Sequence, residues 1–369
     1  MKINIIFSAD KTKLTDCRSV GFFNGDFMGN IQNKNRIDWI DAAKGIAIIF
    51  VLIIHYDRRA AGRIAALGLM FCVQLFFFLS GMFANCEKYT FKEYVKRQAK
   101  ALMLPYAAFS VINIIFHYIF NRGLSLAAFK EIIINILLAR RNHMLVAAMW
   151  FLPCLFLVSL MYKLLTMAIK NKKLLLLLCF GLSAYAKVFM QEPILPFSAN
   201  QAVRFLVYFS AGSILFPYLK DLSMEKFRSQ NTKVKAALII YTVIAAVLIY
   251  ILYKKEYIIY FVNDFLFYSS LFINTVMIIS FVVIISVLLS GFVPLVKIGQ
   301  NTLGFCCLEN INRTIVNTAM ALTGIGFMPD TKLKVVVFNF MAMAIGYVVI
   351  MFINRFCPVL LGKRRKNNS

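Results

Sequence analysis

Four ionisable residues stand inside or at the edge of one strongly apolar stretch, and they are the first candidates for chemistry: Asp38, Asp41, Lys44 and His55. Such side chains are costly to bury at membrane depth, so their presence there points to a function. At about 100° per residue, the eleven steps from Lys44 to His55 return to nearly the same helix face. Asp41 precedes Lys44 by one turn. On a helix, Asp41, Lys44 and His55 therefore form one polar stripe.

Of these residues, His55 has the chemistry best suited to group transfer. A neutral imidazole can take a proton from an alcohol and return it to a thiolate leaving group. It could also carry an acyl group briefly as a nucleophile. We expect Asp41 or Asp57 to orient it. The alternative for His55 is a buried histidine that hydrogen-bonds a neighbouring helix. For Asp38, Asp41 and Lys44 the alternative is an interfacial cap with an internal ion pair.

Other familiar catalytic patterns are absent. His117 lies in an apolar stretch, and His143 lies beside Arg140 and Arg141 in a loop. The sequence contains no P-loop, GxGxxG, GxSxG or HExxH motif and no His/Cys metal-ligand spacing, so we expect no metal site. The eight cysteines are scattered without CxxC spacing and are expected to be small apolar fillers.

A second candidate site is the basic segment 92–100, which contains Arg97 and Lys100 one helical turn apart. Cations placed this way can hold the phosphate groups of a cytosolic donor, with bidentate geometry in the case of arginine. The alternative is ordinary positive charge at the cytoplasmic end of a membrane helix.

The elements that must hold these residues are membrane helices. Hydrophobic residues make up 61% of the chain and charged residues 15%, whereas soluble domains carry about 45–50% and about 25%. The net charge of +25 comes mostly from short Lys and Arg clusters between the apolar runs. Such clusters are topology signals, so we do not expect nucleic-acid binding. The composition predicts an all-α polytopic membrane protein whose surroundings are a lipid bilayer.

About ten stretches approach the ~20 residues needed to cross a bilayer. They are residues 39–57, 64–84, 101–120, 145–168, 174–190, 201–219, 236–253, 270–290, 302–321 and 333–357. The fifth and the ninth are the weakest. Most Lys and Arg fall on the inside if both termini are cytoplasmic, so we predict that orientation.

The remaining segments complete the predicted organisation. Residues 1–36 form a cytoplasmic N-terminal tail without a signal peptide, 37–357 the transmembrane domain, and 358–369 a basic cytoplasmic tail. Residues 124–143 are typical of an amphipathic helix on the outer surface. Residues 257–268 are another interfacial piece or half a span. The sequence shows no internal repeat.

One motif resembles a known family. Residues 35–48 read Asn-Arg-Ile-Asp-Trp-Ile-Asp-Ala-Ala-Lys-Gly-Ile-Ala-Ile, and His55 follows eleven positions after Lys44. This pattern resembles the opening signature of the acyltransferase-3 family of integral membrane O-acyltransferases. Its Asp-x-x-Lys-Gly pattern is similar to the motif of the fucose 4-O-acetylase-like branch.

Further blocks follow in the family's order. Residues 73–81 (Val-Gln-Leu-Phe-Phe-Phe-Leu-Ser-Gly) look like its second-span motif, and Arg97-x-x-Lys100 before Leu104-Pro105-Tyr106 is similar to its basic third-span motif. Residues 150–153 (Trp-Phe-Leu-Pro) resemble its fourth-span motif. Weaker similarities are residues 195–197 leading to Phe209 and Gly212, and residues 298–303. The resemblance covers residues 35–357.

The resemblance implies transfer of an acyl group, usually acetyl, from acyl-CoA to a sugar hydroxyl of an envelope or exported glycan or its lipid-linked precursor. It implies that His55 is essential and that Lys44, Arg97 and Lys100 serve acetyl-CoA. It also implies a multi-pass protein of the bacterial inner membrane. We further expect a substrate cavity formed by Trp150, Gln74, Arg204 and the aromatic residues 76–78.

Two positions differ from the family pattern. The usual Phe-His-Met-Pro is replaced by Phe-Cys-Val-Gln at residues 71–74, and Glu309 stands where a histidine is frequent. Glu309 could replace that histidine as a catalytic proton acceptor. Two alternatives stay open beside the enzyme: a transporter or flippase of lipid-linked saccharides, and a catalytically silent relative in a glycan-synthesis complex. The oligomeric state is also open.

Overall fold

The computed structural model describes residues 36–84, 86–120, 125–141, 144–190, 195–255, 264–322 and 331–362. Within these ranges the chain forms helices and no strand, which confirms the predicted all-α polytopic membrane protein. Most of both predicted tails, His143 and most of the segment 257–268 lie outside the described residues.

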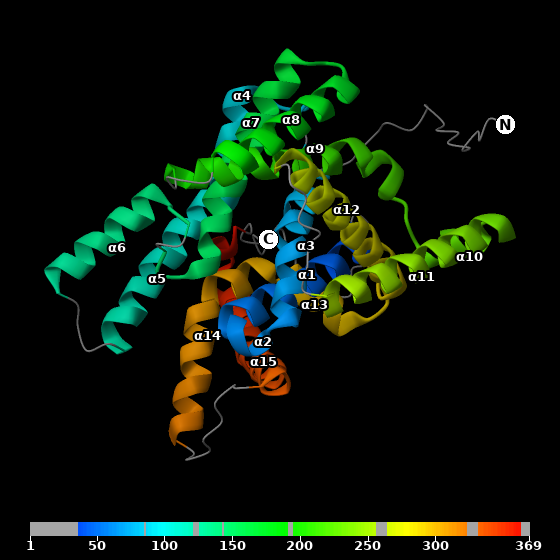
Figure 1. Ribbon diagram of the computed structural model, residues 1–369. Helices are drawn as coiled ribbons and strands as arrows, with labels where there is room; N and C mark the ends of the chain where they lie inside the picture. Colours follow the sequence, from blue (N-terminus) through cyan, green and yellow to red (C-terminus); the bar gives the residue numbers. More distant parts are fainter. Residues whose placement is uncertain are drawn as a thin grey trace, which may run out of the picture.

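The helices follow one another with short connections (Figure 1). In chain order they are α1 (Asp38–Tyr56), α2 (Arg58–Ala61), α3 (Arg63–Gly81), α4 (Phe91–Gln98), α5 (Leu104–Phe120), α6 (Leu126–Leu138), α7 (Phe151–Ala168), α8 (Lys172–Phe189), α9 (Ala199–Leu219), α10 (Met224–Ser229), α11 (Thr232–Lys255), α12 (Asp264–Leu288), α13 (Val293–Gln300), α14 (Thr302–Leu322) and α15 (Lys332–Phe356). A π-helical turn (Ala99–Met103) joins α4 to α5, and a 3-10 turn (Ala147–Trp150) leads into α7.

Among the described residues, eight helical segments are long and apolar enough to cross a membrane. The predicted fifth and ninth spans also form helices, α8 and α14, but they carry more polar residues. α8 contains three lysines, and α14 contains Glu309 and Arg313. The count of ten spans and the cytoplasmic placement of both termini therefore stay predictions.

Helix α1 lies at the centre, in contact with α3, α12, α13, α14 and α15. Alanines at positions 42, 43 and 47 are fully buried, so neighbouring helices approach its backbone closely. The closest approach is at α13, where a Cβ built on Gly299 would overlap the carbonyl of Asp41. The polar stripe of α1 is consequently enclosed by other helices.

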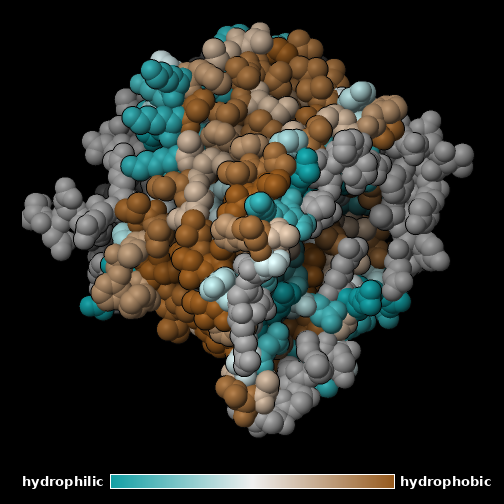
Figure 2. Space-filling model, turned by 90° about the vertical axis from the view of Figure 1, so that its left-hand side faces the viewer, coloured by the Kyte–Doolittle hydropathy of each residue, from teal (hydrophilic) through white to brown (hydrophobic). Residues whose placement is uncertain are grey.

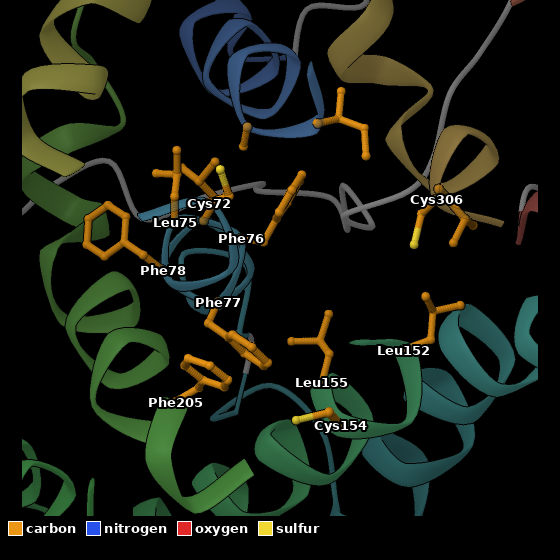
Figure 3. Close-up of a cluster of buried hydrophobic side chains, with 14 of the residues drawn as sticks. Cys72, Leu75, Phe76, Phe77, Phe78, Leu152, Cys154, Leu155, Phe205 and Cys306 are labelled. Atoms are coloured by element: carbon orange, nitrogen blue, oxygen red, sulfur yellow. The ribbon is translucent and has the colours of Figure 1, made fainter. Parts of the chain in front are cut away.

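A second close approach joins α3 to α9. A Cβ on Gly81 would overlap the carbonyl of Phe209, and one on Gly212 would overlap the carbonyl of Phe78. On the same interface the rings of Phe77 and Phe205 stack with centroids 4.7 Å apart (Figure 3). Small residues at helix contacts are the usual means of packing membrane helices. This contact holds α3 in place beside the cavity described below.

The π-helical turn before α5 has a local cause. Pro105 has no N–H group, so the carbonyl of Ala101 cannot receive the usual helical hydrogen bond. The amide of Leu104 donates to the carbonyl of Ala99 instead, which is a π-type bond. Lys100 therefore lies on a widened turn, a feature that is frequent at functional sites.

The periphery is apolar. Exposed large hydrophobic side chains lie along α5, α6, α8 and α11. Figure 2 shows a broad apolar surface with polar patches. No residue of α6 is buried, and α5 and α6 project from one side of the molecule (Figure 1). Such surfaces are expected where helices face lipid. The surface location predicted for residues 124–143 stays a prediction.

Candidate active site

His55 lines a cavity of about 510 Å³, counting its open mouth. The walls come from α1, α3, the turn before α7, the first residues of α7 and the first part of α14. Phe76 of α3, Leu152 of α7 and Cys306 of α14 converge on the cavity (Figure 3). The lining is mostly apolar, with His55 and Thr302 among its polar members. The cavity thus holds one imidazole in apolar surroundings.

The end of α1 is fastened to α14 directly at His55. Arg313 Nη1 donates to the backbone carbonyl of His55 at 3.1 Å, and its Nη2 donates to Asn310 Oδ1 at 3.2 Å. His55 lies in the last turn of α1, whose carbonyls have no partner within the helix. A cation here also suits the negative end of the helix dipole. Arg313 therefore holds the backbone that carries the imidazole.

Glu309 is buried behind the cavity wall. Its side chain is 2% exposed, and its Oε2 has no hydrogen-bond partner among the described residues. It shares a face of α14 with Cys306, which lines the cavity, and with Arg313. It is close enough to interact electrostatically with the Cys306 thiol and the Tyr56 hydroxyl. This carboxyl group lies one turn from the cavity and one turn from the residue that contacts His55.

The two aspartates expected to orient His55 have other partners. Asp41 pairs with Arg36 Nε at 3.1 Å and with Lys44 Nζ at 3.2 Å, and fourteen residues at 1.5 Å each place it about 21 Å along α1 from His55. Asp57 Oδ1 accepts from the amides of Arg59 and Ala60 at 2.8 and 2.9 Å. The expectation for Asp41 is therefore wrong because the helix separates the two groups. The side chain of Asp57 instead caps the start of α2.

Two of the predicted donor residues, Lys44 and Arg97, contact the loop between α3 and α4. Lys44 Nζ is 5.8 Å from the ring centre of Phe83, and the Arg97 guanidinium is 4.3 Å from that of Tyr89. The loop is held by Lys163 of α7, whose Nζ donates to the carbonyls of Cys86 and Tyr89. Arg97 and Lys100 are exposed, whereas Lys44 is buried. We call Arg36, Asp41, Lys44 and Phe83 the α1-start cluster.

The predicted cavity residues are only partly brought together. Trp150 lines the cavity with His55, and the Arg141 guanidinium lies 4.8 Å from its ring centre. Gln74 is buried beside the lining residue Val73, and its Oε1 has no partner among the described residues. Arg204 lies near Phe205, outside the lining. Among residues 76–78, Phe76 lines the cavity.

Sequence reasoning missed three contacts of this site. It identified neither the bond from Arg313 to His55, nor Arg141 beside Trp150, nor Lys163 beside the α3–α4 loop. The contacts of Arg313 and Lys163 join residues 258 and 77 positions apart in the chain. For Arg313 and Lys163, the available signal was a positive charge inside an apolar run. That signal does not identify the residue that the positive charge contacts.

A family model described as an acyltransferase domain matches residues 37–354. The chain belongs to the acyltransferase-3 family. This acyltransferase is a multi-pass membrane protein, as its helices indicate. No curated protein and no solved structure matches the chain at a significant level. The fucose 4-O-acetylase-like branch stays a prediction, and so do the roles of the individual site residues.

Proposed function

We propose that this acyltransferase moves an acyl group, acetyl in the first instance, from acyl-CoA to a sugar hydroxyl of an envelope or exported glycan or its lipid-linked precursor. The observation that carries the proposal is His55 in the wall of an apolar cavity, fastened by Arg313. An imidazole there can exchange a proton with a hydroxyl while the apolar walls exclude water. We place the protein in the bacterial inner membrane.

The reaction balances with His55 as the only proton carrier. Its imidazole takes the proton of the sugar hydroxyl, and the oxygen forms a bond to the thioester carbonyl carbon. When the tetrahedral intermediate collapses, the carbon–sulfur bond breaks and the CoA thiolate receives the proton from the imidazolium. The products are the acylated sugar and free CoA. Glu309, buried one turn from Cys306, would stabilise the imidazolium electrostatically.

The donor would approach from the α1-start cluster. Lys44 and His55 are eleven residues apart, about 16 Å along the axis of α1. A donor that uses both ends must be long, with phosphates at one end and a thioester at the other, and acyl-CoA has this shape. Arg97 beside the loop and Lys100 in the π-helical turn are both exposed, and they would bind the phosphates.

The decisive experiment is mass spectrometry of surface glycans from cells with the gene intact, deleted, or carrying His55→Ala. We expect an acetyl-sized increment that is lost in both altered strains. His117→Ala is the matched control, because His117 lies on α5 outside the cavity lining. It should retain the increment. An acylation pattern unchanged by deletion would contradict the proposal, and a saccharide export assay would then test the transporter alternative.

A purified assay separates the chemistry from the donor site. His55→Ala should lower kcat by about 10²–10⁴-fold, the usual contribution of a general base. Arg97→Gln should instead raise the KM for acetyl-CoA. The comparison with CoA lacking its 3′-phosphate shows whether Arg97 contacts that group. A His55→Ala enzyme with normal kcat would refute the assignment of the imidazole.

A further inference from the structure

One buried lysine takes no part in the proposed reaction. Lys163 lies in the last two turns of α7 and is 6% exposed. A lysine near the end of a membrane helix ordinarily extends its ammonium group to the interface. Lys163 instead keeps it inside the protein, and it forms no ion pair among the described residues. Burial of a charge in this way is costly unless the charge is hydrogen-bonded.

The partners of Lys163 are backbone carbonyls of the α3–α4 loop. Its Nζ donates to the carbonyl of Tyr89 at 2.9 Å and to the carbonyl of Cys86. Buried loop carbonyls need such donors, because no helix supplies them. Two carbonyls three residues apart meet at one ammonium group, so the backbone between them is fixed. α4 also contacts α7 (Figure 1). Lys163 thus ties the loop to α7.

The same loop joins two of the predicted donor residues. Near its start, the ring centre of Phe83 is 5.8 Å from Lys44 Nζ. Near its end, the ring centre of Tyr89 is 4.3 Å from the Arg97 guanidinium. Tyr89 also precedes Thr90, whose side chain caps the start of α4. The position of Tyr89 therefore sets both the guanidinium and the first turn of the helix that carries it.

We propose that Lys163 is a positioning residue for the acyl donor. By fixing the α3–α4 loop, it sets the arrangement of Lys44 and Arg97 that binds the phosphates of acyl-CoA. Lys44 lies about 16 Å from His55 along α1. Lys163 therefore acts on donor affinity and not on the chemical step. This inference rests on the proposed function, because acyl-CoA is the donor in it.

Binding of CoA tests the proposal without an acceptor. In full-length protein in detergent, isothermal titration calorimetry should give a Kd for CoA about tenfold higher for Lys163→Met than for the parent protein. Methionine fills the gap flexibly but donates no hydrogen bond, so the loop is released while α7 stays packed. Lys163→Arg keeps the donor and the charge and should recover most of the affinity. An unchanged Kd for Lys163→Met overturns the proposal.

Lys170→Met is the matched control. Lys170 is exposed just beyond the end of α7, and its Nζ donates to the carbonyl of Thr166 at 3.3 Å. This substitution removes the same charge from the same end of the helix but leaves the loop bonds in place. It should bind CoA like the parent protein. Equal losses in Lys163→Met and Lys170→Met would mean that only the charge matters, and they would overturn the proposal.

The thiol of Cys86 reports the position of the loop directly. Cys86 is 5% exposed, so N-ethylmaleimide should label it slowly in the parent protein. Labelling, followed by peptide mass spectrometry, should be about tenfold faster in Lys163→Met, because a released loop opens more often. Cys179, buried in α8, is the internal reference. If Cys86 stays as slow in Lys163→Met as in the parent, the loop is held without the lysine and the proposal is overturned.

A double-substitution cycle tests the route through Tyr89. Tyr89→Leu removes the ring that Arg97 contacts but keeps the carbonyl that Lys163 binds. It should weaken CoA binding on its own. Added to Lys163→Met, it should cause little further loss, because both changes disturb one contact. Losses that multiply would mean that Lys163 acts independently of Tyr89, which overturns the proposal.

The purified acyl-transfer assay separates positioning from general stability. Lys163→Met should raise the KM for acetyl-CoA about tenfold and leave kcat at saturating acetyl-CoA unchanged. A lower kcat with an unchanged KM would mean that Lys163 supports the fold alone, and it would overturn the proposal. CoA that does not bind the parent protein would overturn the proposed donor and this inference with it. CoA that binds the parent and Lys163→Met equally overturns this inference alone.

Discussion

Two regions of the molecule are built differently: the α1-start cluster and the Trp150 junction, which consists of Ala139, Arg141, Trp150 and Ser198. In the first, the three charged residues are neighbours on one short stretch, and their ion pairs span three and five residues. In the second, Arg141 and Ser198 come from segments 57 residues apart. Local chain geometry alone brings the three charged residues of the first set together, whereas the contact between Ser198 and Arg141 exists only when the end of α6 and the start of α9 have met.

The two regions should therefore respond differently to substitution. The α1-start cluster neutralises buried charge next to the close contact between α1 and α13, so substitutions there should lower the stability of the fold as well as donor binding. The Trp150 junction is assembled with strained backbone beside the cavity. Strain of this kind is kept where function requires it. Changes there should mainly affect acyl transfer in the cavity.

The largest effect is expected from Asp41→Asn. The substitution removes the carboxylate that Lys44 contacts at 3.2 Å, while the lysine stays buried. Breaking one side of a buried pair costs about 4 kcal/mol. The midpoint of thermal unfolding in detergent should fall accordingly. Asp41→Asn combined with Lys44→Met should recover most of the loss, and exposed Asp221→Asn should have no effect. A double variant as unstable as the single one would disprove the pairing argument.

The next effect is expected from Gly299→Ala. The new Cβ would overlap the carbonyl of Asp41 and lie 3.0 Å from the amide nitrogen of Gly45, so α13 must move away from α1. We expect a loss of about 3 kcal/mol, at the upper end for overpacking. Gly181→Ala is the matched control, because a Cβ there meets nothing within 4 Å. It should stabilise α8 by up to about 1 kcal/mol. Equal unfolding midpoints for the two variants would contradict this account.

The same contrast explains what the sequence could predict. Helix periodicity placed Asp41, Lys44 and His55 on α1, and the ion pair between Asp41 and Lys44 follows from their spacing of three residues. The motif order indicated the family, which the family model confirms. Glycines 81, 212 and 299 belong to blocks noted in the sequence, and each meets another helix's backbone. These features depend on local spacing.

What could not be predicted depends on tertiary contacts. The expectation that Asp41 orients His55 treated a common helix face as proximity, although the two residues are separated along the axis by several turns. The bond from Arg313 to His55 spans 258 residues. The left-handed conformations of Ala139 and Ser198 have no sequence signal, because neither residue type favours them. The junction that positions Arg141 was therefore invisible before the fold was known.

A smaller effect is expected from Ser198→Ala. The change removes the acceptor of the Arg141 amide and the donor to the Ala139 carbonyl, both of them in a strained turn. We expect a loss of about 2 kcal/mol from the unpaired groups. The kcat of acyl transfer should fall while the KM for acetyl-CoA stays unchanged, because Arg141 contacts Trp150 in the wall of the cavity. Exposed Ser229→Ala is the control. An unchanged kcat in the destabilised protein would mean that Ser198 supports the fold without directing Arg141.

The smallest effect distinguishes positioning from binding at His55. Arg313→Gln loses the charged contact to the His55 carbonyl, at 3.1 Å, but leaves the imidazole and the Trp150 junction in place. We expect kcat to fall about tenfold, which corresponds to about 1.4 kcal/mol. The KM values for donor and acceptor should stay unchanged, and Arg313→Lys should restore part of kcat. Arg355→Gln, at an exposed arginine outside the cavity lining, should leave every constant unchanged. If Arg313→Gln raised the acceptor KM and left kcat intact, Arg313 would bind the acceptor and would not position His55.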